Sequence, residues 1–200
     1  MTGASALITE TLVVAEEYHR LSDWTLVKES LISNNLLNKI KHSTFNREFA
    51  EIKKRISNLS KQQIELMVSG DMDEAKSMIF LSIIKSYDFF KDFMIEVLSH
   101  KFQLFDRFLA DSDYNRFINY KNINHPELLT ITPETASKVK QVIFRILEQL
   151  GILTSAKNGT IIKPMLSSKS IEVIVNDDAN LLAGFLYSNE EIKNFKSVSI

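Results

Sequence analysis

Apolar and polar residues alternate along most of this 200-residue chain with the 3.6-residue period of amphipathic α-helices. The cleanest repeat follows Ser43, where apolar residues recur three or four positions apart as far as Leu59. The pattern predicts a mainly α protein. Its expected helices span residues 4–20, 24–32, 43–59, 60–68, 73–99, 114–120, 132–150 and 179–186, with a last short helix from about 188.

Residues 132–164 combine a helix, a stop signal and a hairpin. Thr132 is suited to cap the helix and Pro133 to its first turn, while Gly151 stands where a left-handed residue commonly ends a helix. Two apolar pairs then flank Asn158–Gly159, a strong hairpin-turn signal. A helix followed by a small β-hairpin is typical of the recognition helix and wing of a winged helix-turn-helix protein.

A second helix-turn-helix pattern precedes residue 60, and a strand is expected late in the chain. The helix at 24–32, capped by Ser22 or Asp23, leads through a turn into the helix that Ser43 is expected to cap. Apolar residues at 171, 173 and 175 alternate with polar ones, which predicts a strand. We expect an N-terminal helix-turn-helix-like unit, a central helical core and a C-terminal winged-helix-like unit, spanning 1–70, 71–110 and 111–200.

Composition supports a packed helical protein. Hydrophobic residues make up 44%, Phe occurs 13 times, and Gly and Pro number only 5 and 3. The chain has no Cys, which fits a reducing compartment and excludes thiol chemistry. No signal peptide is expected, and the most apolar stretch, 78–98, is interrupted by five charged residues. We therefore expect a cytoplasmic protein without a membrane span.

The net charge of −1 conceals two basic blocks. Residues 36–64 hold seven basic and two acidic side chains, and residues 135–170 hold six basic and one acidic. Between them, 71–113 holds five basic and nine acidic side chains, and the segments 1–35 and 171–200 each carry a net −3. Two basic blocks on an otherwise acidic chain are typical of two nucleic-acid contact surfaces. The alternative is that they are ordinary solvated helix faces.

Candidate DNA contacts lie at the exposed start of each expected recognition helix and in the wing. Polar side chains there suit base edges or phosphates, and the cations suit phosphates. The candidates are Lys41, Ser43, Thr44, Asn46, Arg47 and Lys54 in the first block, and Thr135, Ser137, Lys138, Lys140, Gln141, Lys157 and Lys163 in the second.

Signals for catalysis are missing from the sequence. The four His, at positions 19, 42, 100 and 125, have no metal-ligand spacing, and no phosphate-loop, dinucleotide or nucleophile-elbow motif occurs. Acidic pairs such as Asp71/Asp73 and Asp111/Asp113 fit helix caps and turns. We expect no enzymatic activity, no cofactor and no metal site, although carboxylates assembled in space escape a sequence search.

The order of segments also resembles the BrxA family, a component of the BREX bacteriophage-exclusion systems. The resemblance is carried by SNNLLNKIKHSTFNREFAEIKKRISNLS, IIKSYDFFKDFMIEVL and HPELLTITPETASKVKQVIFRILEQLGIL, and it covers roughly residues 5–190. It implies a cytoplasmic, non-enzymatic protein that binds double-stranded DNA through winged-helix-like ends and works beside other BREX proteins, including a methyltransferase and ATPases. The family has been likened in fold to an RNA antitermination factor.

Three functions stay open at this point. Binding of duplex DNA through both basic blocks is our main expectation. RNA binding is the first alternative, and docking of acidic partner proteins on the basic faces is the second.

Overall fold

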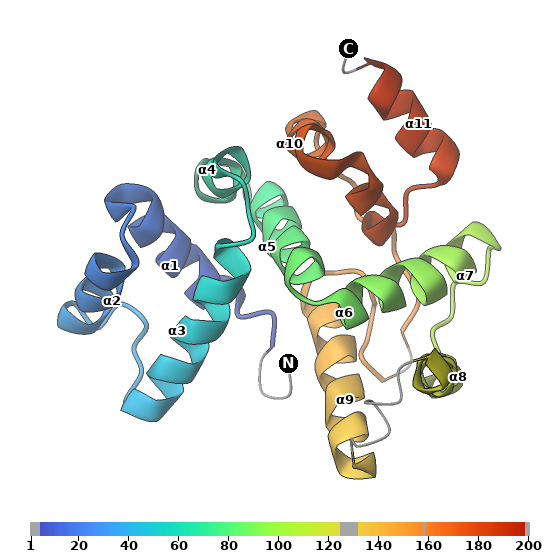
Figure 1. The fold of residues 1–200 in the computed structure, drawn as a ribbon, viewed down its shortest axis with the longest axis horizontal. Helices are drawn as coiled ribbons and strands as arrows, with labels where there is room; N and C mark the ends of the chain where they lie inside the picture. The colour runs from blue at the N-terminus through green and yellow to red at the C-terminus, as the bar shows by residue number, and fades with distance from the viewer. Residues whose placement is uncertain (1–4, 125–131, 158, 199–200) are drawn as a thin grey trace. The chain divides into compact units, whose positions relative to one another are not determined.

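The computed structural model describes residues 5–124, 132–157 and 159–198, and these residues are mainly helical (Figure 1). The predicted fold class, mainly α, is therefore confirmed. β-structure within the described ranges is limited to two isolated antiparallel bridges, Phe108 with Thr160 and Leu153 with Ile161. The helical elements are α1 (Ile8–Leu21), α2 (Trp24–Ser33), α3 (His42–Ile56), α4 (Lys61–Ser69), α5 (Met72–Ser86), α6 (Asp88–Asp92), the π-helix η1 (Phe93–Ser99), α7 (His100–Gln103), α8 (Asp111–Asn124), α9 (Pro133–Gln149), α10 (Ser168–Asp178), the 3-10 helix η3 (Ala179–Phe185) and α11 (Asn189–Val198).

The described residues group into two compact units. The first, here called the α3 unit, is built from residues 7–87 and 166–178. The second, the α9 unit, takes its described residues from 5–6, 88–165 and 179–198. The chain thus leaves the α3 unit after Tyr87 and returns to it for α10. The expected division at residues 70 and 110 stays a prediction.

Helix caps set the ends of the α3-unit helices, several of them as expected. The Asp23 carboxylate accepts the N–H groups of Thr25 and Leu26 at 2.7 and 3.0 Å, so it caps α2. Ser60 and Gln63 form a reciprocal capping box at the start of α4. The Ser43 cap predicted for α3 is wrong, because the helix already begins at His42, with the Lys41 carbonyl accepting the Phe45 N–H at 3.1 Å.

The predicted strand at 171–175 is helical instead and belongs to α10. Ser167 overrides the alternating pattern, because its hydroxyl accepts the Ser170 N–H at 3.1 Å and so caps a helix. The fully buried positions of α10 are Ser170 and Ile174, which lie one helical turn apart. The alternating apolar residues flank this stripe rather than forming one face of a strand.

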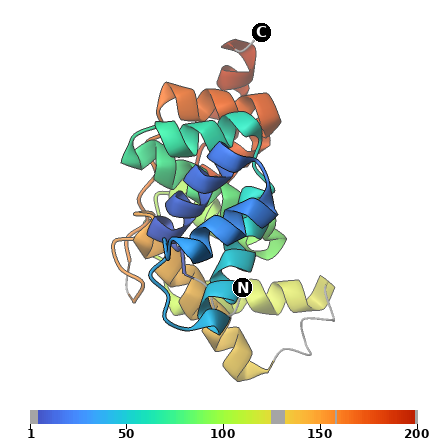
Figure 2. The ribbon, with the colours of Figure 1, turned by 90° about the vertical axis from the view of Figure 1, so that its left-hand side faces the viewer.

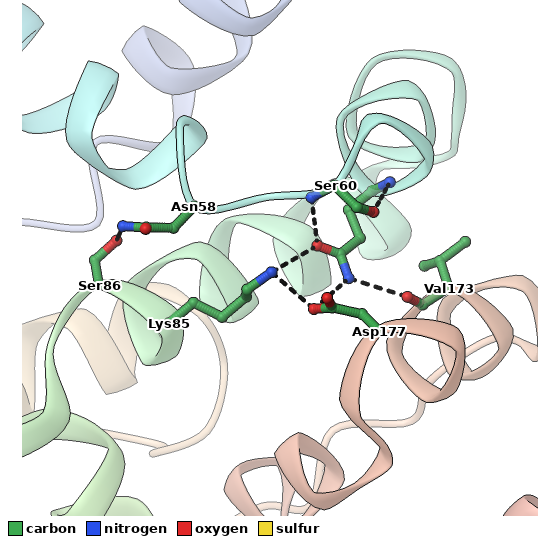
Figure 3. Close-up of polar contacts among 7 residues, drawn as sticks. Asn58, Ser60, Lys85, Ser86, Val173 and Asp177 are labelled. Atoms are coloured by element: carbon green, nitrogen blue, oxygen red, sulfur yellow. Dashed lines mark hydrogen bonds and ion pairs between the residues drawn. The ribbon is translucent and has the colours of Figure 1, made fainter.

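Polar contacts fix α10 against α4 and α5, beside which it lies in Figures 1 and 2. The Gln63 amide donates to the Val173 carbonyl at 3.0 Å and to the Asp177 carboxylate at 3.2 Å (Figure 3). Lys85 forms an ion pair with the same carboxylate at 2.7 Å. Burial would raise the pKa of Asp177, but the hydrogen bonds from Lys85 and Gln63 outweigh it and the pKa is lowered.

The helix expected over 73–99 is interrupted at Tyr87. This residue is extended, with φ −139° and ψ 97°, and it ends α5. Its hydroxyl donates to the Glu51 carboxylate of α3 at 2.5 Å, a contact that a continued helix would not provide. The apolar period runs through the break without Gly or Pro because residues on both sides of it are buried, so the pattern concealed the interruption.

The α9 unit is organised around Phe93. Its ring lies 5.6 Å from Tyr114, 5.3 Å from Phe117 and 6.3 Å from Phe144, measured between centroids. These partners come from α8 and α9, so one side chain joins both helices to the rod formed by α6, η1 and α7 (Figure 1). The helices predicted at 114–120 and 179–186 are present as the longer α8 and as the 3-10 helix η3.

We expect Asp177→Asn to lower the free energy of unfolding by about 1–2 kcal/mol at neutral pH, the scale of a charged hydrogen bond. The folded pKa of Asp177 lies below the unfolded value of about 3.9. The stabilisation is therefore complete above about pH 5 and is lost as the pH falls through these two values. Urea unfolding of variant and wild type from pH 7 to 3 should show the difference shrinking. Glu172→Gln, an exposed carboxylate change on α10, is the control, and equal behaviour of both variants would contradict the role of the contact.

Candidate nucleic-acid interface

The outer face of α3 holds the first set of predicted contacts. Phe45, Phe49, Ile52 and Ile56 point inward and are buried, as their spacing predicts. The opposite face exposes Ser43, Asn46, Arg47 and Lys54, with Lys41 exposed at the N-cap and Thr44 half-buried.

The two acidic residues of α3 are turned away from this face. Glu48 pairs with Lys39 at 3.0 Å, and Glu51 pairs with Arg55 at 2.8 Å. The sequence pattern predicts that Arg55 faces outward, but its side chain is 0% exposed and pairs with Glu51, which also accepts the Tyr87 hydroxyl. The acids therefore neutralise inner cations and leave the outer face without a carboxylate of its own helix.

The exposed cations of α3 differ in how firmly they are held. Lys54 lies 4.2 Å above the ring of Tyr87, and Lys53 lies 5.5 Å from that of Trp24. These cation–π contacts orient the ammonium groups without cancelling their charge. Within the described part of the chain, Arg47 and Lys41 form no ion pair. The face is consequently a cationic surface, here called the α3 face.

Helix α9 presents the second set of contacts on its first half. Thr132 accepts the Thr135 N–H at 3.3 Å, and Pro133 occupies the first turn, so the predicted cap is confirmed. Burial along the apolar stripe is complete only in the second half of the helix, at Ile143, Phe144, Ile146 and Leu147. Ser137, Lys138 and Gln141 are exposed, and Thr135 is half-buried.

A cleft of about 340 Å³ brings four of the predicted residues together. Its lining, here called the α9 cleft, consists of Asp111, Ser137, Lys140, Gln141, Phe144, Arg145, Ala156 and Lys157. Arg145 and Asp111 are not among the candidate contacts predicted from the sequence. Arg145 could have been found from its spacing, since it lies one and two turns beyond Gln141 and Ser137 on the same helix face.

Two predicted cations are engaged by carboxylates. Lys140 pairs with Asp111 at 2.7 Å. Lys163 pairs with Glu191 at 2.6 Å and lies 3.9 Å from the ring of Tyr187. Burial would raise the pKa of Glu191, but its hydrogen bond from Lys163 helps to lower it overall. Both ion pairs reduce the positive charge that the sequence count attributes to this block.

The segments after α9 pair in an antiparallel manner. Gly151 has φ +74°, the left-handed conformation expected at the helix end. The Ile162 N–H donates to the Ile152 carbonyl at 2.8 Å, and the Thr154 N–H to the Thr160 carbonyl at 3.1 Å. Asn158 of the predicted turn lies outside the described residues, and so do residues 125–129, whose sequence predicts a turn and a short helix.

The segment before α8 joins this pairing. The Ile161 N–H donates to the Arg107 carbonyl at 2.6 Å, and the Leu109 N–H donates to the Gly159 carbonyl at 3.2 Å. Three short extended segments thus lie side by side in the α9 unit, and Lys157 stands in the connection between two of them.

Comparison with known proteins places this fold in a family. The family model described as BrxA matches residues 1–178. The chain belongs to the BrxA family. A relative named BREX protein BrxA from Bacillus cereus (strain H3081.97) is 32% identical over 149 residues, 74% of each chain. Another of the same name from Escherichia coli O9:H4 (strain HS) is 23% identical over 157 residues, 78% of this chain and 74% of its own.

A solved structure with a similar fold comes from Magnetospirillum magneticum. The crystal structure of that uncharacterized protein has a TM-score of 0.80 at 17% identity and covers 92% of this chain and 95% of its own. The resemblance to the BrxA family seen in the sequence is therefore confirmed, and the match makes this protein a BREX component. Among the described residues, no helix has the length and hydrophobicity to cross a membrane.

Arg47 and Arg55 should respond differently to loss of charge. Arg55→Gln should lower the free energy of unfolding by about 3–5 kcal/mol, because it leaves the Glu51 carboxylate without its buried partner. Arg47→Gln should change stability by less than about 0.5 kcal/mol, since its side chain is exposed. Thermal and urea unfolding of the two variants provides the measurement. Equal destabilisation would mean that Arg47 is part of the packing and not of an open surface.

Proposed function

We propose that this BrxA-family protein is a non-enzymatic, cytoplasmic component of BREX phage defence that binds double-stranded DNA, mainly through phosphate contacts. The observation that carries the proposal is the α9 cleft, which brings together Lys140 and Arg145 of helix α9 and Lys157 of the connection between the two paired segments. Ser137 and Gln141 add hydrogen-bonding groups of the kind that contact phosphates and base edges.

The order of elements in the α9 unit supports a winged helix-turn-helix. Helix α7 is followed by the extended segment 107–109, then by α8, α9 and the paired segments at 152–154 and 160–162. In such a unit α9 is the recognition helix, and its first turns enter the major groove. Lys138 is exposed there, and Lys157 lies where a wing reaches a neighbouring phosphate.

The α3 face supports a second contact surface. Its exposed cations are Lys41, Arg47, Lys53 and Lys54, and its acids are paired inward. Exposed cations attract any polyanion, so this surface alone favours phosphate contact and carries no base specificity. The same chemistry would serve RNA or an acidic BREX partner protein, and the experiment below separates these occupants.

We predict that binding to a random labelled duplex weakens steeply with salt, with a log–log slope of about −0.9 for each phosphate neutralised. Lys138→Glu and Arg47→Glu should each weaken binding about tenfold or more at low salt and make the slope shallower by about 1. Fluorescence anisotropy titrations from 50 to 300 mM salt would measure both quantities.

The controls are Lys193→Glu in the α9 unit and Lys76→Glu in the α3 unit, which make the same charge change within acidic stretches of the chain. Unlabelled structured RNA, added as competitor, tests the RNA alternative. If the structured RNA displaces the labelled duplex more effectively than unlabelled duplex does, RNA and not DNA is the ligand. Protein docking would remain as the role of these surfaces if both test variants still bound the duplex as tightly as wild type. The same conclusion would follow if wild type bound no duplex at low salt.

A further inference from the structure

We propose that Asp111 is an internal competitor of the phosphate in the α9 cleft, so that its carboxylate holds duplex-DNA affinity below what the cleft's cations could give. The inference rests on the proposed function and adds a regulating residue to it. The charges of the cleft lining are unequal, because one carboxylate, that of Asp111, lies among three cationic side chains.

The geometry makes Asp111 a substitute for a phosphate oxygen. Its Oδ2 lies 2.7 Å from Lys140 Nζ, the distance at which an ammonium group holds a phosphate oxygen. The Lys140 side chain is 21% exposed and the Asp111 side chain 65% exposed, so the lysine is mostly buried in the cleft lining and the aspartate is largely exposed to solvent. A ligand phosphate that uses Lys140 therefore has to take the place of this carboxylate.

The other two cations of the cleft stay open to a ligand. Arg145 and Lys157 are exposed, and neither forms an ion pair with another described residue. An incoming phosphodiester thus meets two unneutralised cations and one that is already neutralised. Displacement of Asp111 should release the third, because an exposed ion pair is weak and its carboxylate is readily hydrated.

The competing contact should leave the cleft with only a weak affinity for a single free anion. With Lys140 neutralised by Asp111, two charges remain to attract a phosphate. Such an arrangement favours a ligand that offers several phosphates at once over a single free anion, because only the former gains enough from Arg145 and Lys157 to displace the carboxylate.

The test is Asp111→Asn, with duplex affinity measured against salt. Loss of the competitor should tighten binding about two- to fivefold at low salt, the scale of an exposed ion pair. The slope should become more negative by up to about 0.9, because no displaced carboxylate is left to take up a cation when Lys140 binds its phosphate. The Ala110 N–H before α8 stays bound to the Asp113 carboxylate at 2.9 Å, so α8 should stay folded, which circular dichroism would check.

The matched control is Asp106→Asn. It removes an equal charge from the same unit, where Asp106 pairs with Lys101 outside the α9 cleft. In a double variant, Asp111→Asn with Lys140→Gln should bind no more tightly than Lys140→Gln alone, because the gain acts through that lysine.

Each outcome has a definite meaning. Wild type that binds DNA while Asp111→Asn and Asp106→Asn behave alike would overturn this inference and leave the proposed function standing. A gain that persists in the double variant would also overturn it, since the effect would then be general electrostatics. Failure of both wild type and Asp111→Asn to bind any duplex at low salt would refute the proposed function and this inference together.

Discussion

The buried contact of Glu51 with Arg55 and Tyr87 determines which side of α3 faces solvent. An uncompensated charge inside a protein costs several kcal/mol, so Arg55, at 0% exposure, holds Glu51 beside it. Burial, and then the bond to the Glu51 carboxylate, raise the pKa of Tyr87 and keep its hydroxyl a donor. This contact sets the rotation of α3 about its axis, and Arg47 and Lys54 are exposed as a consequence. It also holds Tyr87 extended, which ends α5 and closes the α3 unit.

Local signals in the sequence predicted the fold where they agreed with burial. The caps at Asp23, Ser60 and Thr132 and the left-handed Gly151 are short-range features, and the structure confirms them. Two of the failures involve a distant partner. Tyr87 breaks a periodic apolar run because of Glu51, 36 positions earlier. Residues 171–175 are helical because Ser167 caps α10 and because α10 packs on α4 and α5, where Asp177 contacts Lys85 and Gln63 (Figure 3).

The candidate site was less predictable than the fold, because a sequence counts charges but does not pair them. Both basic blocks have a net charge of +5 by composition. In the structure Arg55, Lys140 and Lys163 are all held by carboxylates, two of which come from outside the blocks. The useful positive charge therefore resides in residues such as Arg47, Lys138, Arg145 and Lys157. Of these, Arg145 was not among the predicted contacts, although it shares a helix face with Ser137 and Gln141, and the three-dimensional cleft brings it together with Lys157.

The nearly neutral total charge has a physical consequence for a protein proposed to bind DNA. At physiological salt, charges separated by more than about 8 Å are screened, so a net charge of −1 neither attracts nor repels a duplex from afar. Attraction begins only when the α3 face or the α9 cleft comes within that distance, while acidic stretches such as 71–113 repel the phosphates. Productive encounters are thereby restricted to orientations that place a cationic surface on the backbone. At shorter range, ion pairs within the protein such as Asp111 with Lys140 have a similar effect. They determine how many unneutralised cations a phosphate encounters when it reaches the surface.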